Sequence, residues 1–236
     1  TFGGSGVAVV DFNGGDDQVY AMAVLPDGKI VLAGTTLQGG GRDYALARFC
    51  ADGNLDNGVN CGSPGFAAGG KIITDFGGQE DVAALLLQPD GDLVAAGSTR
   101  TCPNSDMAVA RYNADGKLDT GFSTDGKATV DFSGFWDEAR GVAWHPEGNL
   151  VVAGYSNVVN TNQDFALASL CPNGGLDDGI NCGSPAFGSG GLVTTAVLMD
   201  STDESALQKA PLEDVDTAIV AIGDQIEASI LTTALL

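Results

Sequence analysis

A turn sequence that recurs along the chain divides it into repeats. Pro-Asp-Gly begins at Pro26 and again at Pro89, and Pro-Glu-Gly begins at Pro146, so successive copies start 63 and 57 residues apart. Two further landmarks keep the same spacing, an Asp-Phe pair that begins at Asp11, Asp75 and Asp131 and an Ala-Gly pair that begins at Ala33, Ala96 and Ala153. A period of about 60 residues predicts a fold built from similar units that pack on their neighbours.

Each copy contains four short segments in which apolar and small residues alternate between Gly, Asp and Asn residues. This pattern predicts strands, and the proline turn joins the second strand to the third. The expected strands are 7–12, 18–25, 29–34 and 43–49 in copy one, 71–76, 81–88, 92–97 and 106–112 in copy two, and 127–132, 139–145, 149–154 and 164–170 in copy three. Four antiparallel strands per repeat are typical of a propeller blade.

The sequence therefore predicts an all-β protein, with residues 1–236 forming one four-bladed β-propeller. The blades are expected at 7–49, 71–112, 127–170 and 192–235, and residues 1–6 are expected to close the ring. Phe2 would take the place that Phe66, Phe122 and Phe187 have in the linkers, so that no sheet edge stays open. A part of a larger propeller is the alternative.

The predicted fourth blade is eroded. Ala196 and Val197 stand where the other copies have Asp-Phe, and residues 211–217 replace the compact proline turn. A helical interpretation of residues 201–236 competes with the strands.

The repeat resembles the delta-60 family of bacterial repeats, in which Gln-Pro-Asp-Gly-Lys-Ile-Val-Val-Ala-Gly is followed by Ala-Leu-Ala-Arg-Tyr-Asn-Ala-Asp-Gly. The matching residues are 25–34, 88–97, 145–154 and 108–119, and the resemblance covers residues 1 to about 191. It implies a propeller-like repeat protein that is secreted or lies at the cell surface. It implies no activity.

The charge balance excludes one class of partner. The chain has 31 acidic and 10 basic residues, and its formal net charge of -21 would repel phosphate backbones and anionic lipid headgroups. We therefore expect no nucleic-acid binding. We also expect no membrane insertion, because no stretch approaches the roughly 20 apolar residues needed to cross a bilayer. The chain begins at Thr1 without a signal-type segment, which fits a processed protein or an excised fragment.

Four of the five cysteines form two equivalent pairs. Cys50 and Cys61 have the same spacing and repeat position as Cys171 and Cys182, and copy two lacks both members. Because each pair is present or absent as a unit, the pattern predicts two disulfides and an extracellular, cell-surface or periplasmic location. Zinc is disfavoured because the pairs lack Cys-x2-Cys spacing. Cys102 is left over, either as an exposed thiol or for an intermolecular bond.

Candidate chemistry is sparse. His145 is the only histidine, and nothing in the sequence assigns it or any other residue a catalytic role. The recurrent aspartates are interpreted as turn and strand-end residues. No cofactor is expected apart from calcium, for which 13–17 and 52–56 are the candidate loops. Phe135 and Trp136 are a candidate partner contact, with packing on the neighbouring blade as the alternative.

These observations favour a non-enzymatic binding or structural module of a secreted or cell-surface protein. Its partner would be a protein or a glycan, or a further copy of the chain within a larger assembly. The alternative is a carbohydrate-active hydrolase or lyase that uses carboxylates in the propeller channel.

Overall fold

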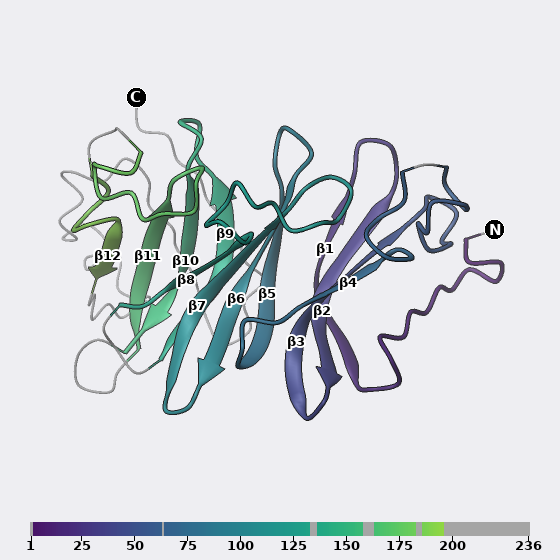
Figure 1. The fold of residues 1–236 in the computed structure, drawn as a ribbon, viewed down its shortest axis with the longest axis horizontal. Coiled ribbons are helices and arrows are strands. Elements are labelled where there is room, and N and C mark those ends of the chain that lie inside the picture. The colour runs from purple at the N-terminus through teal and green to yellow at the C-terminus, as the bar shows by residue number, and fades with distance from the viewer. Residues whose placement is uncertain (1, 63, 133–135, 158–162, 183–185, 196–236) are drawn as a thin grey trace, which may run out of the picture. The chain divides into compact units, whose positions relative to one another are not determined.

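The computed structural model describes residues 2–62, 64–132, 136–157, 163–182 and 186–195. In this part of the chain the strands form three four-stranded antiparallel sheets, which follow one another in chain order (Figure 1). Within the described residues no helix has the length and apolarity to cross a membrane. The structure therefore has the all-β fold with four strands per unit that the repeat pattern predicts.

The strand bounds are as follows. Sheet 1 contains β1 (Asp17–Val24), β2 (Ile30–Gln38), β3 (Gly41–Phe49) and β4 (Lys71–Thr74). Sheet 2 contains β5 (Gln79–Leu87), β6 (Leu93–Thr101), β7 (Asn104–Tyr112) and β8 (Lys127–Val130). Sheet 3 contains β9 (Asp137–Trp144), β10 (Leu150–Ser156), β11 (Asp164–Leu170) and β12 (Leu192–Thr195).

The predicted blade boundaries are shifted by one strand. Each sheet combines the last three strands of one copy with the first strand of the next copy, because β4 pairs antiparallel with β3 and β8 pairs with β7. The linker after β3 remains on its own sheet, where the Arg48 amide donates to the carbonyl of Gly70 at 2.9 Å. The strand that follows the linker therefore meets the free edge of β3 before the chain crosses to the next sheet.

The predicted strand 7–12 is not a strand in the structure. Its equivalents β4 and β8 pair with the third strand of the preceding copy, and no preceding copy lies within this sequence. Without that edge, the segment has no neighbouring strand to pair with, and side chains bond part of its backbone instead: the Phe12 amide donates to Oδ2 of Asp17 at 2.8 Å and Nζ of Lys71 donates to the Asp11 carbonyl at 2.7 Å. Of the predicted fourth blade at 192–235, residues 192–195 form β12 in sheet 3, and the remainder lies outside the described residues.

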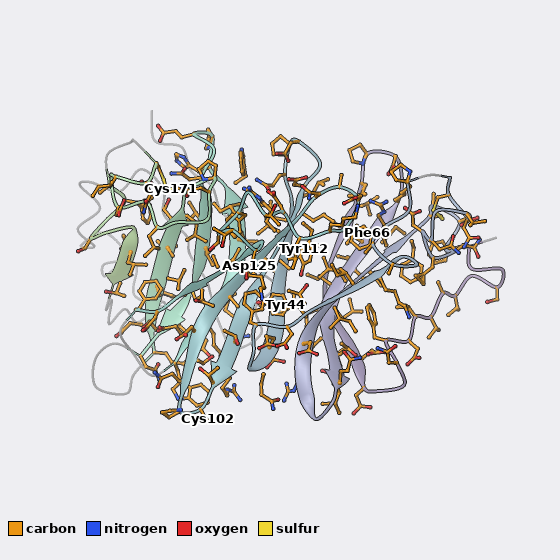
Figure 2. The ribbon with its side chains drawn as sticks, in the orientation of Figure 1. Tyr44, Phe66, Cys102, Tyr112, Asp125 and Cys171 are labelled. Carbon is orange, nitrogen blue, oxygen red and sulfur yellow. A yellow bond between two sulfur atoms is a disulfide. The ribbon has the colours of Figure 1, made fainter. Side chains whose placement is uncertain are left out.

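The hydrophobic core lies between consecutive sheets. Side chains alternate along each strand, so Leu93 and Ala95 of β6 face sheet 1, whereas Val94 and Ala96 face sheet 3. Tyr44 is fully buried on the sheet 1 side of the first junction, where its hydroxyl donates to the carbonyl of Ala108 at 3.0 Å (Figure 2). Stacking is therefore the main source of burial in this fold.

The recurrent Ala-Gly pair has a steric cause. The pairing of β5 with β6 is interrupted by a bulge between Val82 and Ala84, opposite Gly97. A β-carbon added to Gly97 would lie 1.9 Å from the carbonyl oxygen of Asp81. Glycine is required there because the bulged neighbour strand brings its backbone too close for any side chain.

Candidate functional site

Two of the linker phenylalanines, Phe66 and Phe122, dock on a turn of the following repeat. The amide of Ala67, next to Phe66, donates to the carbonyl of Asp115 at 2.6 Å, and the amide of Ser123, next to Phe122, donates to the carbonyl of Asn173 at 2.7 Å. Phe66 and Phe122 are fully buried. The linker thus holds consecutive repeats together.

The turn that receives the phenylalanine ring must present a glycine. A β-carbon on Gly116, whose φ is +82°, would lie 2.6 Å from Cδ2 of Phe66. Phe2 reaches Gly53 in the same way, and the amide of Gly3 donates to the carbonyl of Asp52 at 2.6 Å. Phe2 therefore occupies the linker position on the first repeat, while the closure of a ring of four blades by residues 1–6 stays a prediction.

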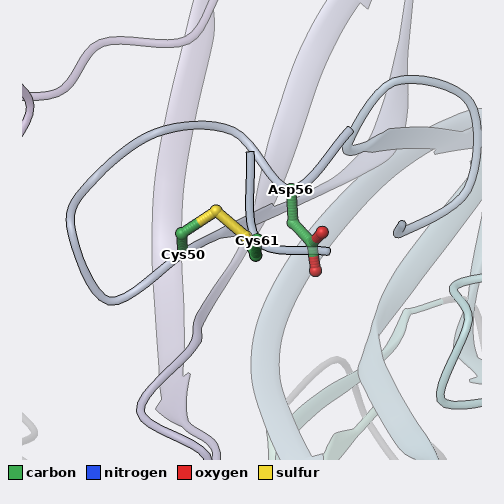
Figure 3. Close-up of side chains that lie close together, drawn as sticks. All are labelled: Cys50, Asp56 and Cys61. Atoms are coloured by element: carbon green, nitrogen blue, oxygen red, sulfur yellow. A yellow bond between two sulfur atoms is a disulfide. The ribbon is translucent and has the colours of Figure 1, made fainter. Parts of the chain in front are cut away.

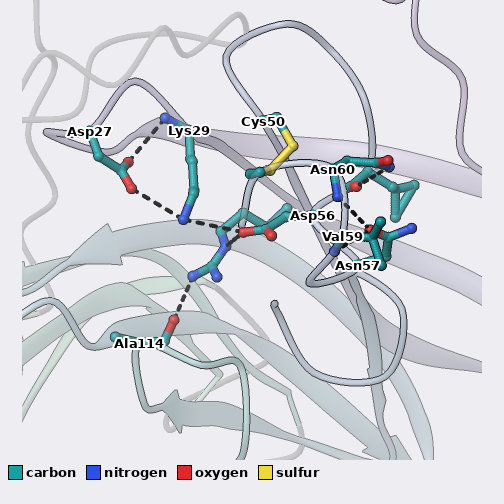
Figure 4. A network of polar contacts seen from close by, with 11 residues as sticks. Asp27, Lys29, Cys50, Asp56, Asn57, Val59, Asn60 and Ala114 are labelled. Carbon is teal, nitrogen blue, oxygen red and sulfur yellow. Dashed lines mark hydrogen bonds and ion pairs between the residues drawn. A yellow bond between two sulfur atoms is a disulfide. The ribbon is translucent and has the colours of Figure 1, made fainter. Parts of the chain in front are cut away.

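An arginine strengthens the first junction (Figure 4). Nε of Arg48 donates to Oδ2 of Asp56 at 2.7 Å, and Nη1 donates to the carbonyl of Ala114 in the next repeat at 2.5 Å. The Arg48 guanidinium also lies over the Phe66 ring, 4.8 Å from its centroid. Nζ of Lys29 is 3.5 Å from the same Asp56 oxygen. One buried carboxylate thus orients the arginine that links two repeats.

The third repeat lacks this arginine. In the second repeat Arg111 pairs with Asp119 and lies over the Phe122 ring. In the third repeat Ser169 stands at the arginine position, and Asp177 instead accepts a hydrogen bond from Nδ2 of Asn149 at 2.8 Å. The arginine that pairs with a loop aspartate and lies over the linker ring is therefore present in the first two described repeats and replaced in the third, and the hydrogen bond to the next repeat is that of Arg48 to Ala114.

Both expected disulfides are present. Cys50 is bonded to Cys61 (Figure 3) and Cys171 to Cys182, and each bond closes the loop that follows the third strand of its repeat. Cys102 is a free, exposed cysteine in the turn between β6 and β7. Asp56 lies near Cys50 and Cys61, and Asp177 lies near Cys171 and Cys182. Because each cysteine pair forms a disulfide, its sulfurs are not available as metal ligands.

The face of sheet 1 that points away from sheet 2 carries exposed apolar side chains. In the strand register, Val19 of β1 corresponds to Val82 of β5 and Ala139 of β9. Val82 and Ala139 are 3% and 1% exposed because the preceding sheet covers them, whereas Val19 is 56% exposed. Met22 and Val24 on the same strand are also exposed. This set, Val19, Met22 and Val24, is referred to below as the β1 face.

Sheet 3 has a complementary exposed position. Tyr44 of β3 and Met107 of β7 are fully buried against the following sheet. Phe165 of β11, at the equivalent position, is 53% exposed. Phe165, together with the half-buried Leu167 of β11 and Val151 and Ala153 of β10, is referred to below as the β11 face.

The described hollows are small. One of about 230 Å³ is lined by Asp16, Gln18 and Arg42 among others, and one of about 220 Å³ lies between segment 8–12 and β1. Pockets for small ligands usually have volumes of roughly 300–1,000 Å³. The second hollow lies on the outer side of sheet 1, whereas the first lies on the side that faces sheet 2, where Arg42 pairs with Asp81 of β5.

Of the two residues of the candidate partner contact, Phe135 and Trp136, the structure describes Trp136. Trp136 is 37% exposed, and the guanidinium of Arg100 from β6 lies over its ring at 4.6 Å from the centroid. The tryptophan thus contacts sheet 2, as the packing alternative predicts. Phe135 lies outside the described residues.

His145 lies in the turn after β9. Its Nδ1 accepts a long hydrogen bond of 3.4 Å from the amide of Glu147, which is a local contact within the turn.

In the two candidate calcium loops the carboxylates hold turns. Oδ2 of Asp17 accepts from the amide of Phe12, and Oδ1 of Asp52 accepts from the amide of Asn54. The structure instead brings together aspartates from different strands, at the junctions between sheets. Sequence reasoning interpreted these as turn residues. Each position recurs, since Asp43 is equivalent to Asp106, Asp75 to Asp131 and Glu80 to Asp137, but recurrence along the chain does not show that the three positions meet in space.

Three stretches of the chain match a known family model. Residues 25–58, 88–122 and 145–179 match a beta-propeller domain of unknown function (DUF5122). Each stretch runs from the proline turn through the loop after the third strand, so the comparison confirms a β-propeller-like repeat.

The C-terminal segment matches a different model. Residues 189–236 match the TrkA-N domain, over the stretch in which the repeat pattern predicts a fourth blade. A stretch of 45 residues is 53% identical to Ktr system potassium uptake protein C of Bacillus subtilis (strain 168), covering 19% of this chain and 20% of that protein. The chain thus spans about a fifth of the length of this curated relative.

Proposed function

Because three of its repeats match a β-propeller family, we propose that this protein is a non-enzymatic structural module of a secreted or cell-surface assembly. Copies of the chain associate head to tail, with the β1 face of one copy packed on the β11 face of the next. Each such contact repeats the stacking that already joins sheet 1 to sheet 2.

The exposure pattern is the observation that carries this proposal. Val19 is exposed where Val82 and Ala139 are buried, and Phe165 is exposed where Tyr44 is buried. The two faces correspond to the two sides of an internal junction, so they are complementary by the repeat itself. A contact between two different faces is heterologous, and it extends to closed rings or open filaments.

The proposed location rests on the cysteines. Two disulfides, Cys50–Cys61 and Cys171–Cys182, are stable in oxidising compartments and rare in the cytosol. The net charge of -21 favours solubility of a secreted protein.

The proposal applies to residues 1–195. The segment that matches the TrkA-N domain belongs to a different family model, and no function for the repeats follows from it. For a carbohydrate-active enzyme, the clustered carboxylates would have to reach a sugar, yet Glu80 and Asp137 of these clusters are fully buried.

Sedimentation velocity over a range of protein concentrations tests the assembly, in a Cys102→Ser background that prevents intermolecular disulfides. We expect concentration-dependent association that Val19→Lys and Phe165→Lys each reduce, because a buried unpaired lysine is costly in an apolar contact. Val59→Lys is the matched control, since Val59 is 83% exposed in the first disulfide loop, away from both faces.

Mixing the two variants makes the test specific. The Val19→Lys chain keeps its β11 face and the Phe165→Lys chain keeps its β1 face, so an equimolar mixture should form a defined heterodimer that cannot grow. A chain that stays monomeric at all concentrations, or a mixture that does not pair, contradicts the proposal.

A further inference from the structure

Three carboxylates meet at each of the two junctions between described sheets. Asp43 of β3, Asp75 after β4 and Glu80 of β5 each place an oxygen within 4.8 Å of the others. Asp106, Asp131 and Asp137 form the equivalent cluster between sheets 2 and 3. In both clusters two members come from one sheet and the third from the next, so the clusters span the junctions.

The member from the following sheet is buried and only partly satisfied. Glu80 is fully buried, and its Oε1 accepts from the amide of Gly78 and from the hydroxyl of Thr99, both at 2.8 Å. Its second oxygen, Oε2, is buried without a hydrogen-bond partner. A buried carboxylate oxygen that lacks a donor is costly unless an ion or a proton satisfies it.

The second cluster repeats this arrangement with a different residue type. Asp137 is fully buried, and its Oδ2 accepts from the amide of Phe132 at 2.8 Å. Its Oδ1 is buried without a partner, as Oε2 of Glu80 is. Asp17 of the first repeat has the same bond from the amide of Phe12 and the same unpartnered oxygen, Oδ1. At the two junctions, unlike at Asp17, two carboxylates of the preceding sheet lie beside this position.

The neighbouring charges of these carboxylates are negative. Burial, followed by the charges of Asp131 and Asp137, raises the pKa of Asp106. Burial raises the pKa of Asp43, and the charge of Asp75 adds to this. Three carboxylates at such distances repel one another at neutral pH and favour a bound cation.

We propose that each junction binds one divalent cation of the calcium type through its three carboxylates. Calcium takes six to eight oxygen ligands at about 2.3–2.6 Å, so ligand oxygens on opposite sides of the ion are up to about 5 Å apart. The separations within both clusters fit this limit. Asp75 and Asp131 are exposed, which leaves room for water to complete the ligand set.

The bound ions connect consecutive sheets. Each ion would neutralise most of a cluster and supply the partner that Oε2 of Glu80 or Oδ1 of Asp137 lacks. These sites differ from the loops 13–17 and 52–56 that the sequence analysis considered. They join carboxylates from separate strands, and each therefore contributes to the stacking of sheets.

Terbium titration of the full chain, after treatment with EDTA and dialysis, measures the number of sites. We expect two tight sites that calcium displaces competitively. The midpoint temperature of thermal unfolding at pH 7 should rise by roughly 10 °C when the calcium concentration exceeds the dissociation constant about 100-fold at both sites. Sodium chloride of equal ionic strength should not reproduce the rise.

Single substitutions assign the sites. Asp43→Asn and Asp106→Asn should each reduce the stoichiometry from two to one, and the double variant should bind no ion. In cation-free buffer both variants should be at least as stable as the parent, because each removes a repelling charge. Asp164→Asn is the matched control: Asp164 has the equivalent place in β11, and Ala196 stands where the next repeat would supply its acidic partner.

Each outcome decides the proposal. A parent chain whose unfolding temperature does not respond to calcium, or responds equally to sodium chloride, overturns it and indicates carboxyls that share protons. A double variant that still binds two ions also overturns it, since the ions would then lie elsewhere on the acidic surface.

Discussion

At the scale of single residues, Arg48 combines three roles in one side chain. It pairs with Asp56, reaches the carbonyl of Ala114 and lies over Phe66. The Arg48 and Asp56 side chains are only 5% and 0% exposed. A buried pair of this kind stabilises little relative to apolar residues, but loss of one partner leaves the other charge uncompensated.

We therefore expect Arg48→Ala to lower the free energy of unfolding by about 3–5 kcal/mol. Urea denaturation followed by circular dichroism measures the change. Arg140→Ala is the control, because Arg140 is 57% exposed in its pair with Glu138 and should contribute only about 0–1 kcal/mol. Equal losses for the two variants would show that Arg48 is not a junction residue.

At the scale of elements, the loop after the third strand differs among the repeats. The first and third repeats close it with a disulfide, while in the second repeat Asn113 stands at the position of the first cysteine and the second cysteine is absent. Tyr112 is equivalent to Phe49 and Leu170 at the end of the third strand. Tyr112 is fully buried, and its hydroxyl donates to Oγ1 of Thr74 at 2.8 Å. The second loop is thus fixed by packing on sheet 1.

The double substitution Cys50→Ser/Cys61→Ser should lower the free energy of unfolding by about 2–3 kcal/mol, because it removes a constraint on a short loop of the unfolded chain. Chemical denaturation under non-reducing conditions measures this loss. Cys102→Ser should change stability little, since Cys102 is exposed and unbonded. If the double variant is as stable as the parent, the disulfide does not constrain the unfolded state.

At the scale of the whole molecule, carboxylates govern the pH dependence. Burial raises the pKa of Glu80 and of Asp137, although hydrogen bonds oppose it in both cases. The folded state therefore binds protons more tightly than the unfolded state between about pH 4 and the raised values. By contrast, amide hydrogen bonds from Asn181 and Ile180 lower the pKa of the exposed Asp178. The stabilisation of the folded state by the ionised Asp178 is therefore lost only in more acidic solution.

In cation-free buffer the free energy of unfolding should consequently rise as the pH falls from 7 to about 5. Urea denaturation at these two pH values, with EDTA present, tests the sign. With calcium present the order should reverse, because protons compete with the ion for the same oxygens. The double variant Asp43→Asn/Asp106→Asn should show a weaker pH dependence of the free energy of unfolding in EDTA. An unchanged pH dependence would mean that it arises from carboxyls outside the two clusters.

Repeat periodicity alone predicted much of the site. The equivalent positions of Cys50 and Cys171 predicted the disulfides, and the place of Phe2 before two glycines predicted its docking on the first repeat. The carboxylate clusters could not be predicted in this way. Asp43, Asp75 and Glu80 are separated along the chain, and each alone is typical of a turn or strand end.

The sequence by itself determined local features of this protein: strand content, turn positions, the bonded cysteines and the period of about 60 residues. Alternation, turn glycines and paired cysteines lie within single repeats, so comparing the copies along the chain is enough to show them. Only the tertiary structure decided that β4 joins the preceding sheet, that Arg48 reaches the next repeat and that acidic residues meet at the junctions. These features depend on how one sheet stacks on another, and the burial that drives stacking is set by the whole surfaces that meet, not by any single segment.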